Sequence, residues 1–221
     1  MSPVRETQGG RPLLITDCDE VLLHMVSHFR DWLGEHHAID FYIGAGDFQR
    51  SMRRRDREDL LTPEEMWGLL GGFFPGEIGR QTLVPGAAEA LGALAEEADV
   101  VVLTNLHDVC RQPRIDQLAR FGIRHRVECN QGGKGGPVAR LVEEYAPSVA
   151  VFVDDLPVHH ESVAKHAPGV HRLHMVSEPE LAAAIPPAPF AHARIDDWAE
   201  AKDWIAGRFA ARRPAEQEEH A

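Results

Sequence analysis

The sequence contains few lysines, few cysteines and no long apolar run. Three of its 23 basic residues are lysines, and its three cysteines, Cys18, Cys110 and Cys129, are widely spaced. An odd and dispersed set of cysteines fits neither a disulfide framework nor a zinc site. No stretch approaches the roughly 20 consecutive apolar residues that a membrane span needs. The first dozen residues are polar and lack the apolar segment of a secretory signal, so we expect a cytoplasmic protein with no membrane partner.

Basic residues are also outnumbered by acidic ones, which gives the chain a formal net charge of −12. Such an acidic chain is not expected to bind nucleic acid or anionic membranes through a general positive field. Hydrophobic residues make up 43% and charged residues 26% of the chain, which is typical of globular proteins. A length of 221 residues suits one domain with a modest insertion.

Short apolar runs alternate with helical stretches along most of the chain. The runs are residues 13–15, 100–103 and 149–153, with a weaker strand expected at 171–176. This alternation is the signature of a parallel sheet that is covered on both faces. We therefore predict an α/β fold with a Rossmann-like, doubly wound parallel sheet.

Helices are expected between these runs, after Pro85-Gly86, after Gly135-Gly136-Pro137 and near residues 196–210. Residues 24–83 break the alternation and hold two or three helical segments without a confident strand. We predict an α/β core from 11–23 and 84–211, a small helical cap from 24–83, and flexible termini at 1–10 and 212–221. The charged end of the chain lacks apolar anchors.

Thr62-Pro63-Glu64-Glu65 is a capping box with proline at the first helical position, so it predicts a helix start inside the insertion. The charged run from 50 to 59, with arginines at 50, 53, 54, 55 and 57, could meet an anionic substrate, but we expect it to line a solvated helix face with Asp56, Glu58 and Asp59. Burial preferences place the aromatic residues of the insertion in its core rather than in a substrate platform. These residues are Trp32, Phe41, Tyr42, Phe48, Trp67, Phe73 and Phe74.

Polar residues follow each apolar run directly, at 16–17, 104–105 and 154–155. Ligands of open α/β sheets bind beyond the carboxyl ends of the strands, so these ends converge on one crevice. Asp17 and Asp19 are two residues apart and point the same way from an extended chain. Because two close carboxylates repel, they need a shared proton or a hard cation such as Mg²⁺. One carboxylate can then attack phosphorus while the other transfers a proton.

Three further elements supply what phosphoryl transfer requires. Thr104 and Asn105 offer a hydroxyl, an amide and nearby backbone amides for phosphoryl oxygens. Lys134 lies between two glycine pairs, which allow the backbone to approach closely. Asp154 and Asp155 add carboxylates for the metal.

Taken in order, TDCDEV, VVLTN, GGK and VFVDD resemble the four motifs of the haloacid dehalogenase-like superfamily, over residues 13 to 155. The resemblance implies a Mg²⁺-dependent phosphatase that acts on a small phosphorylated metabolite. Asp17 would form an aspartyl-phosphate, and Asp19 would protonate the leaving oxygen and then activate water. Thr104 and Lys134 would hold the phosphoryl group.

The resemblance also implies a metal site formed by Asp17, the Asp19 carbonyl and Asp155, with Asp154 close by or bridged by water. It does not say which of the two adjacent aspartates ligates directly. Glu20 departs from the family pattern, in which a small or flexible residue often follows the second aspartate. This glutamate either narrows the site or alters the turn.

Other functions fit the sequence less well or remain open. A receiver domain has its acidic pair first in sequence, and a nucleotide-binding P-loop would need a glycine where Glu128 stands. Dehalogenases of this superfamily generally lack an equivalent of Asp19, and phosphonatases need a cap lysine that residues 24–83 do not contain. A phosphomutase remains open, as does a non-catalytic relative that binds a phosphate ligand or a protein. Deoxynucleotides, sugar phosphates and small phosphorylated acids all fit the motifs as substrates.

Overall fold

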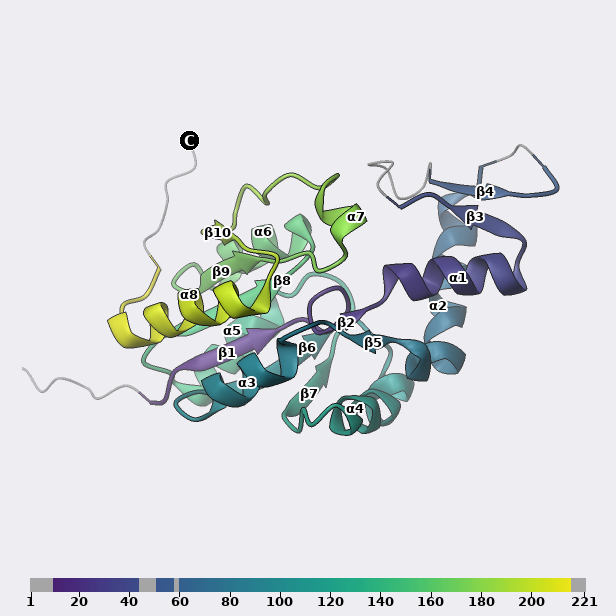
Figure 1. Ribbon diagram of the computed structural model, residues 1–221. Coiled ribbons are helices and arrows are strands. Elements are labelled where there is room, and N and C mark those ends of the chain that lie inside the picture. The colour runs from purple at the N-terminus through teal and green to yellow at the C-terminus, as the bar shows by residue number, and fades with distance from the viewer. Residues whose placement is uncertain (1–9, 44–50, 58–59, 216–221) are drawn as a thin grey trace, which may run out of the picture.

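A computed structural model describes residues 10–43, 51–57 and 60–215. Most residues of the two predicted flexible termini, 1–10 and 212–221, therefore lie outside the described part. A parallel sheet of six strands, in the order β10-β9-β8-β1-β6-β7, forms its centre (Figure 1). The predicted doubly wound α/β fold is confirmed. The strands are β1 (Leu13–Thr16), β6 (Asp99–Thr104), β7 (Arg126–Cys129), β8 (Ala150–Asp154), β9 (His171–His174) and β10 (Ala193–Arg194).

Alternating side chains of the central strands enter two separate cores, as the two-residue period of a strand requires. Leu14 and Val102 belong to one core, with residues of α3 (Ala87–Ala95), α4 (Arg111–Arg120) and α8 (Trp198–Ala211). Ile15 and Val101 belong to the other core, with residues of α5 (Gly135–Tyr145) and α6 (Pro157–His166). Figure 1 shows α3 and α8 on one side of the sheet and α5 and α6 on the opposite side.

The four predicted strands are present as β1, β6, β8 and β9, whereas β7 and β10 were not predicted. Strand β7 has the sequence RVEC, in which charged residues alternate with partly apolar ones, and it lies at the edge of the sheet. Strand β10 is only two residues long. Neither segment contains the continuous apolar run that reveals a buried parallel strand.

The insertion between β1 and β6 lies beyond the carboxyl end of the sheet (Figure 1). Two short strands, β2 (Leu23–His24) and β5 (Thr82–Leu83), pair antiparallel at its base. It contains α1 (Val26–His36), β3 (Ile39–Phe41), β4 (Met52–Arg54), α2 (Pro63–Glu77) and the 3₁₀ helix η1 (Ile78–Arg80). These elements bury a core of their own around Phe29 and Phe73.

Two expectations for the insertion are wrong. It contains strands, because β3 and β4 pair antiparallel. The arginine run forms β4 and the turn after it rather than a helix face, and Arg54 and Arg55 bind Glu65 and Asp40. Extended backbone here lets alternate side chains reach acidic partners on neighbouring segments. Arg50, Glu58 and Asp59 of the same run lie outside the described residues.

The capping box is confirmed, because Thr62 Oγ1 accepts a hydrogen bond from Glu65 N at 3.3 Å and Glu65 Oε2 accepts one from Thr62 N at 2.9 Å. The burial of the aromatic residues is confirmed for Trp32, Phe41 and Phe73. Phe74 is partly buried and packs against the same core. The expectation is wrong for Tyr42 and Trp67, which are 58% and 62% exposed, while Phe48 lies outside the described residues.

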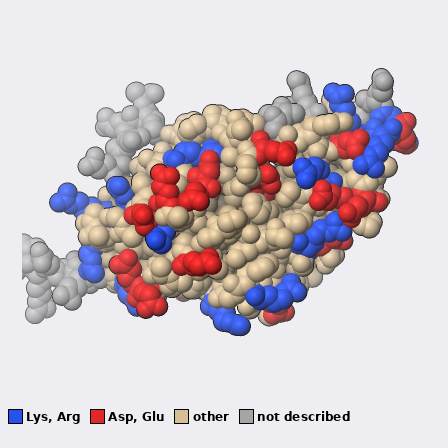
Figure 2. All heavy atoms as spheres, viewed as in Figure 1, with Lys and Arg blue, Asp and Glu red and all other residues tan. Residues whose placement is uncertain are grey.

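The remaining elements are the 3₁₀ helix η2 (Asp108–Cys110) and α7 (Pro179–Ala182). In the part of the chain that the structure describes, no helix combines the length and the apolar character of a membrane span. On the face shown in Figure 2, the basic side chains of the described residues lie among acidic ones.

Candidate active site

Asp17 directly follows β1 at the carboxyl edge of the sheet. Its amide donates to Val153 O of the neighbouring strand at 2.8 Å, which fixes its backbone. Its Oδ1 accepts hydrogen bonds from Cys18 N at 2.7 Å and from Lys134 Nζ at 2.8 Å. Among the described residues no donor contacts Oδ2, so one oxygen of a buried and oriented carboxylate is available for chemistry.

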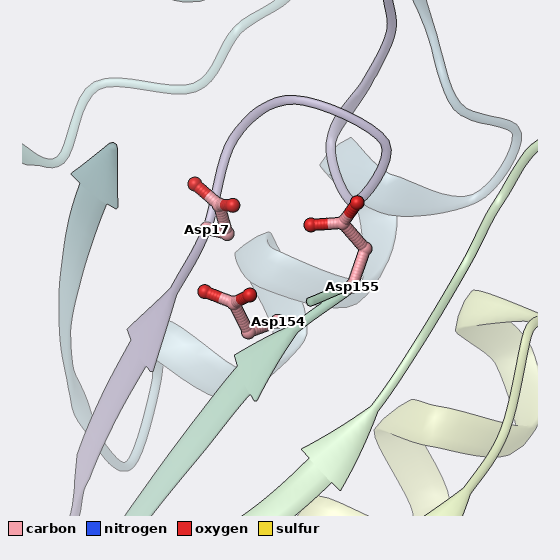
Figure 3. Close-up of side chains that lie close together, drawn as sticks. All are labelled: Asp17, Asp154 and Asp155. Carbon is pink, nitrogen blue, oxygen red and sulfur yellow. The ribbon is translucent and has the colours of Figure 1, made fainter. Parts of the chain in front are cut away.

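Asp154 and Asp155 follow each other at the end of β8, beside Asp17. Figure 3 shows the three carboxylates around a common space, and one oxygen from each lies within 4.8 Å of the others. Both carboxylate oxygens of Asp154 already accept hydrogen bonds, Oδ2 from Lys134 Nζ at 2.7 Å and Oδ1 from Leu156 N at 2.9 Å. The Asp155 carboxylate accepts no hydrogen bond from any described residue. Asp155 is therefore the better placed of the pair for direct metal ligation.

This cluster carries more negative charge than the chain itself neutralises. When all three carboxylates are ionised they face one ammonium, that of Lys134, which leaves two negative charges in a buried space. Burial and the neighbouring aspartates raise the pKa of Asp17 to about 7, against the opposing effect of Lys134. Burial, Asp154 and Asp17 raise the pKa of Asp155 well above its usual range. A hard divalent cation with oxygen ligands, such as Mg²⁺, fits both the donor atoms and the charge of this site.

Lys134 is fully buried and bridges two of the three carboxylates. Burial would lower its pKa, but Asp154 and Asp17 outweigh that effect and raise it. In turn, Lys134 holds the pKa of Asp154 below the ordinary value, although burial alone would raise it. The lysine is therefore charged and positioned where a phosphoryl group held by Asp17 would need neutralisation.

The glycine beside Lys134 has a specific steric role. A Cβ atom at Gly135 would lie 2.1 Å from Ser162 O, so only glycine allows α5 to start this close to α6. Gly135 N also donates to Ser162 Oγ at 3.0 Å. The interpretation that the glycines permit close backbone approach is confirmed at this position.

The side chain of Asp19 lies apart from the three clustered carboxylates. Its Oδ1 and Oδ2 accept from Arg114 Nη2 at 2.8 and 3.1 Å, and Oδ1 also accepts from Gln81 Nε2 at 2.7 Å. Thr104 Oγ1, which is fully buried, lies 3.4 Å from Asp19 Oδ2. A metal bond from Asp19 through its carbonyl, as the resemblance implies, stays a prediction.

Sequence reasoning missed Arg114, which is completely buried in α4. A signal was present in the spacing, because Arg114 falls four residues after Cys110 and four before Leu118, both buried. It therefore occupies an apolar position of the helix, where a charged residue needs a buried partner. Gln81, which donates to Asp19 from the end of the insertion, was missed as well.

Asn105 links the loops around the site. Its Nδ2 donates to Gly132 O at 2.9 Å and lies 3.3 Å from His159 Nε2, while its Oδ1 accepts from Asn130 Nδ2 at 2.9 Å. These contacts hold the loop after β6 against the loop that leads to Lys134. Its role in substrate binding stays a prediction.

Glu20 determines the turn and the start of α1. Its φ of 58° lies in the left-handed region, and its Oε1 accepts from Met25 N at 2.7 Å and Val26 N at 2.6 Å. Burial raises its pKa to about 7. Of the two expectations for this residue, the altered turn is the one supported by these contacts.

Comparison with known proteins finds no matching family model and no matching curated protein. Solved structures do match over nearly the whole chain. A haloacid dehalogenase superfamily hydrolase of subfamily IA from Geobacter sulfurreducens PCA shares 20% identity, with 91% of this chain and 100% of that chain covered and a TM-score of 0.54.

Two further structures are similar at TM-scores of 0.58. A predicted phosphoglycolate phosphatase from Haemophilus somnus 129pt is 17% identical, with 87% of this chain and 96% of that chain covered. A protein assigned as a β-phosphoglucomutase from Thermotoga maritima is 14% identical, with 89% and 99% covered. The chain therefore has the haloacid dehalogenase-like fold that its four motifs predict.

Proposed function

We propose that this protein is a Mg²⁺-dependent phosphatase that hydrolyses a small phosphorylated metabolite through an aspartyl-phosphate at Asp17. One observation carries the proposal. Lys134 Nζ contacts Asp17 at 2.8 Å and Asp154 at 2.7 Å, and Asp155 completes the same cluster. Three segments far apart in sequence thus bring three carboxylates and one ammonium together, which supports these roles.

The reaction divides between two aspartates. The Oδ2 of Asp17, which no described donor contacts, attacks phosphorus, the bond from phosphorus to the leaving oxygen breaks, and Asp19, protonated at the start of this step, gives that oxygen its proton. Asp19 then takes a proton from water as the water attacks phosphorus, which releases phosphate and restores Asp17. Thr104 and Lys134 hold the phosphoryl oxygens during both steps, and Arg114 keeps the Asp19 carboxylate in place.

Asp17, Asp155 and the Asp19 carbonyl would hold the Mg²⁺ ion, with Asp154 fixed beside them by Lys134. When bound, the ion neutralises charge on the carboxylates and on the transferring phosphoryl group. The hardness of the oxygen donors and the two uncompensated negative charges support magnesium over a softer metal.

We further propose that residues 24–83 act as a cap over this site. They follow β1 directly and lie beyond the strand ends from which the site residues project (Figure 1). A cap in this place would exclude bulk water during phosphoryl transfer and contact the substrate. A cytoplasmic location belongs to the same proposal.

A phosphomutase is the second candidate, supported by the similarity to the protein assigned as a β-phosphoglucomutase. The two activities share the phosphorylation of Asp17 and differ in the acceptor, which is water in one case and a second hydroxyl of the sugar phosphate in the other. A non-catalytic relative would bind phosphate and perform neither step.

Release of p-nitrophenol from p-nitrophenyl phosphate tests the proposal. We expect turnover with Mg²⁺, none with EDTA and none in Asp17→Asn. Isomerisation of hexose phosphates without phosphate release would favour the phosphomutase. If the metal-loaded protein releases no phosphate from a broad panel of metabolites, the phosphatase proposal is wrong.

A further inference from the structure

A cavity of about 450 Å³ lies between α2 and the loop that follows β6. Trp67, Leu70 and Phe74 of α2 form one wall, and Leu106 and Val109 contribute to the other. None of the side chains that line it in the described part of the chain is Asp, Glu, Lys or Arg. Its volume falls in the range of small-molecule sites, and its lining is largely apolar, with two amide side chains and the imidazole of His107 as polar groups.

The cavity adjoins the proposed catalytic residues. Asn105 and Gly132 belong to its lining and hydrogen-bond to each other at 2.9 Å. Asn105 directly follows Thr104, and Gly132 lies two residues before Lys134. An ester held with its phosphoryl group between Thr104 and Lys134 can therefore extend its organic part into this space.

Helix α2 presents apolar residues on two faces: one enters the core of the insertion, and on the other Leu70 and Phe74 pack partly buried against that core while Trp67 is exposed. Met66 and Phe73 enter the core of the insertion. Trp67, Leu70 and Phe74, spaced three and four residues apart, lie on one further side of the helix and line the cavity. Trp67 is 62% exposed, and Val109 in η2 is 77% exposed. Large apolar side chains on two walls of one cavity have surface to bury against a ligand.

The buried guanidinium of Arg114 lies near the cavity but is not available to bind a ligand in it. Arg114 lies with its guanidinium 5.9 Å from the Phe74 ring, but it is bound to Asp19, Gln81 and Gln117. Of the described side chains that line the cavity, only that of His107 can carry a positive charge, so a carboxylate or a second phosphate there would lose its water without gaining a lysine or arginine partner, which is costly.

We propose that this cavity binds the leaving group of the substrate and selects monophosphate esters whose organic part is apolar and carries no negative charge. This inference rests on the proposed phosphatase function and narrows its substrate class. It places small phosphorylated acids, which the motifs alone leave open, among the poor substrates.

A matched pair of esters tests the selectivity. 4-Isopropylphenyl phosphate and 4-carboxyphenyl phosphate have similar size and differ in charge, and the carboxylated phenol is the better leaving group. We expect kcat/KM to be at least tenfold higher for the isopropyl ester. Equal values, or a preference for the carboxylated ester, would overturn the inference while leaving the phosphatase function standing.

Trp67→Ala provides the second arm, because this exposed side chain can be removed with little effect on folding. KM for 4-isopropylphenyl phosphate should rise about tenfold, a loss typical of an aromatic contact. Turnover of acetyl phosphate, whose leaving group has no large apolar part to pack against Trp67, should not change. Tyr42→Ala is the matched control, since Tyr42 is 58% exposed and is not part of this cavity.

The outcomes separate the two proposals. An equal effect of Trp67→Ala on both substrates, or no effect on either, means that the cavity does not bind the leaving group. If the Mg²⁺-loaded parent releases phosphate from no ester at all, the phosphatase function is wrong and the substrate assignment falls with it.

Discussion

Replacing Lys134 by methionine removes the cation at the centre of the carboxylate cluster while keeping a side chain of similar length. Lys134 is fully buried and makes ion pairs of 2.8 Å with Asp17 and 2.7 Å with Asp154. Breaking a buried pair by removing one partner costs about 3–5 kcal/mol, because the other charge stays buried without compensation. We expect a loss of unfolding free energy of that size in EDTA at pH 8.

The loss should be smaller at pH 6. The pKa of Asp17 is already about 7 in the parent, above its ordinary value of 3.8. For an acid whose folded-state pKa is raised, the folded state binds more protons, so stability declines as the pH rises through that pKa. Without Lys134 the pKa rises further, and protonation at pH 6 relieves part of the repulsion.

Urea unfolding in EDTA at pH 6 and pH 8 measures both effects. Lys165→Met is the control, because this lysine lies on the surface of α6, where it pairs with Glu161. It should change stability by less than about 0.5 kcal/mol at either pH. In Mg²⁺, Lys134→Met should also lower kcat for p-nitrophenyl phosphate by roughly 100-fold or more. The reasoning is refuted if Lys134→Met is as stable and as active as Lys165→Met.

Three further predictions concern the surroundings of the cluster. Asp155→Asn should weaken Mg²⁺ binding, measured by calorimetry, by at least about tenfold, with little change in the stability of the metal-free protein. An unchanged Mg²⁺ affinity would show that Asp155 is not a metal ligand. Gly135→Ala should lower the unfolding free energy by about 1–3 kcal/mol, because its Cβ would collide with Ser162 O. If urea unfolding shows no loss of stability, the close approach of α5 to α6 is contradicted. Burial lowers the pKa of His192 to about 4, and its Nδ1 accepts a hydrogen bond from Arg172 N at 2.9 Å. Because of this lowered pKa, His192 binds fewer protons in the folded state than in the unfolded state. Stability should therefore fall as the pH drops from about 6.5 towards 4, and His192→Gln should flatten that part of the pH profile.

The sequence predicts the sheet well where strands are continuous and buried. Residues 13–15, 100–103 and 149–153 are apolar because they are covered on both faces, and this leaves an unmistakable pattern. Edge strand β7 has one partner strand and carries Arg126 and Glu128, which hide it among loop sequences. The β3–β4 hairpin was missed because its arginines resemble a solvated helix face, whereas their acidic partners come from segments up to 15 residues away.

The site could be predicted only in part for a similar reason. The ends of β1, β6 and β8 must meet at one edge, so the positions of Asp17, Thr104 and Asp155 follow from topology. The hydrogen bonds from Arg114 and Gln81 to Asp19 depend on how α4 and the insertion pack. The spacing of residues in the sequence does not predict that packing. The exposure of Trp67 likewise depends on a cavity between two elements rather than on the pattern of α2 alone.

The most direct test of the account is to trap the phosphoryl group on its acceptor. Asp19→Ala retains the nucleophile and lacks the group that activates water, so with Mg²⁺ and p-nitrophenyl phosphate it should accumulate one phosphoryl group per chain. Intact mass and peptide mapping after borohydride reduction should place that group on Asp17, and Asp17→Asn combined with Asp19→Ala should remain unlabelled. Phosphorylation of another residue, or full turnover by the double variant, would contradict the claim that Asp17 is the nucleophile of this site.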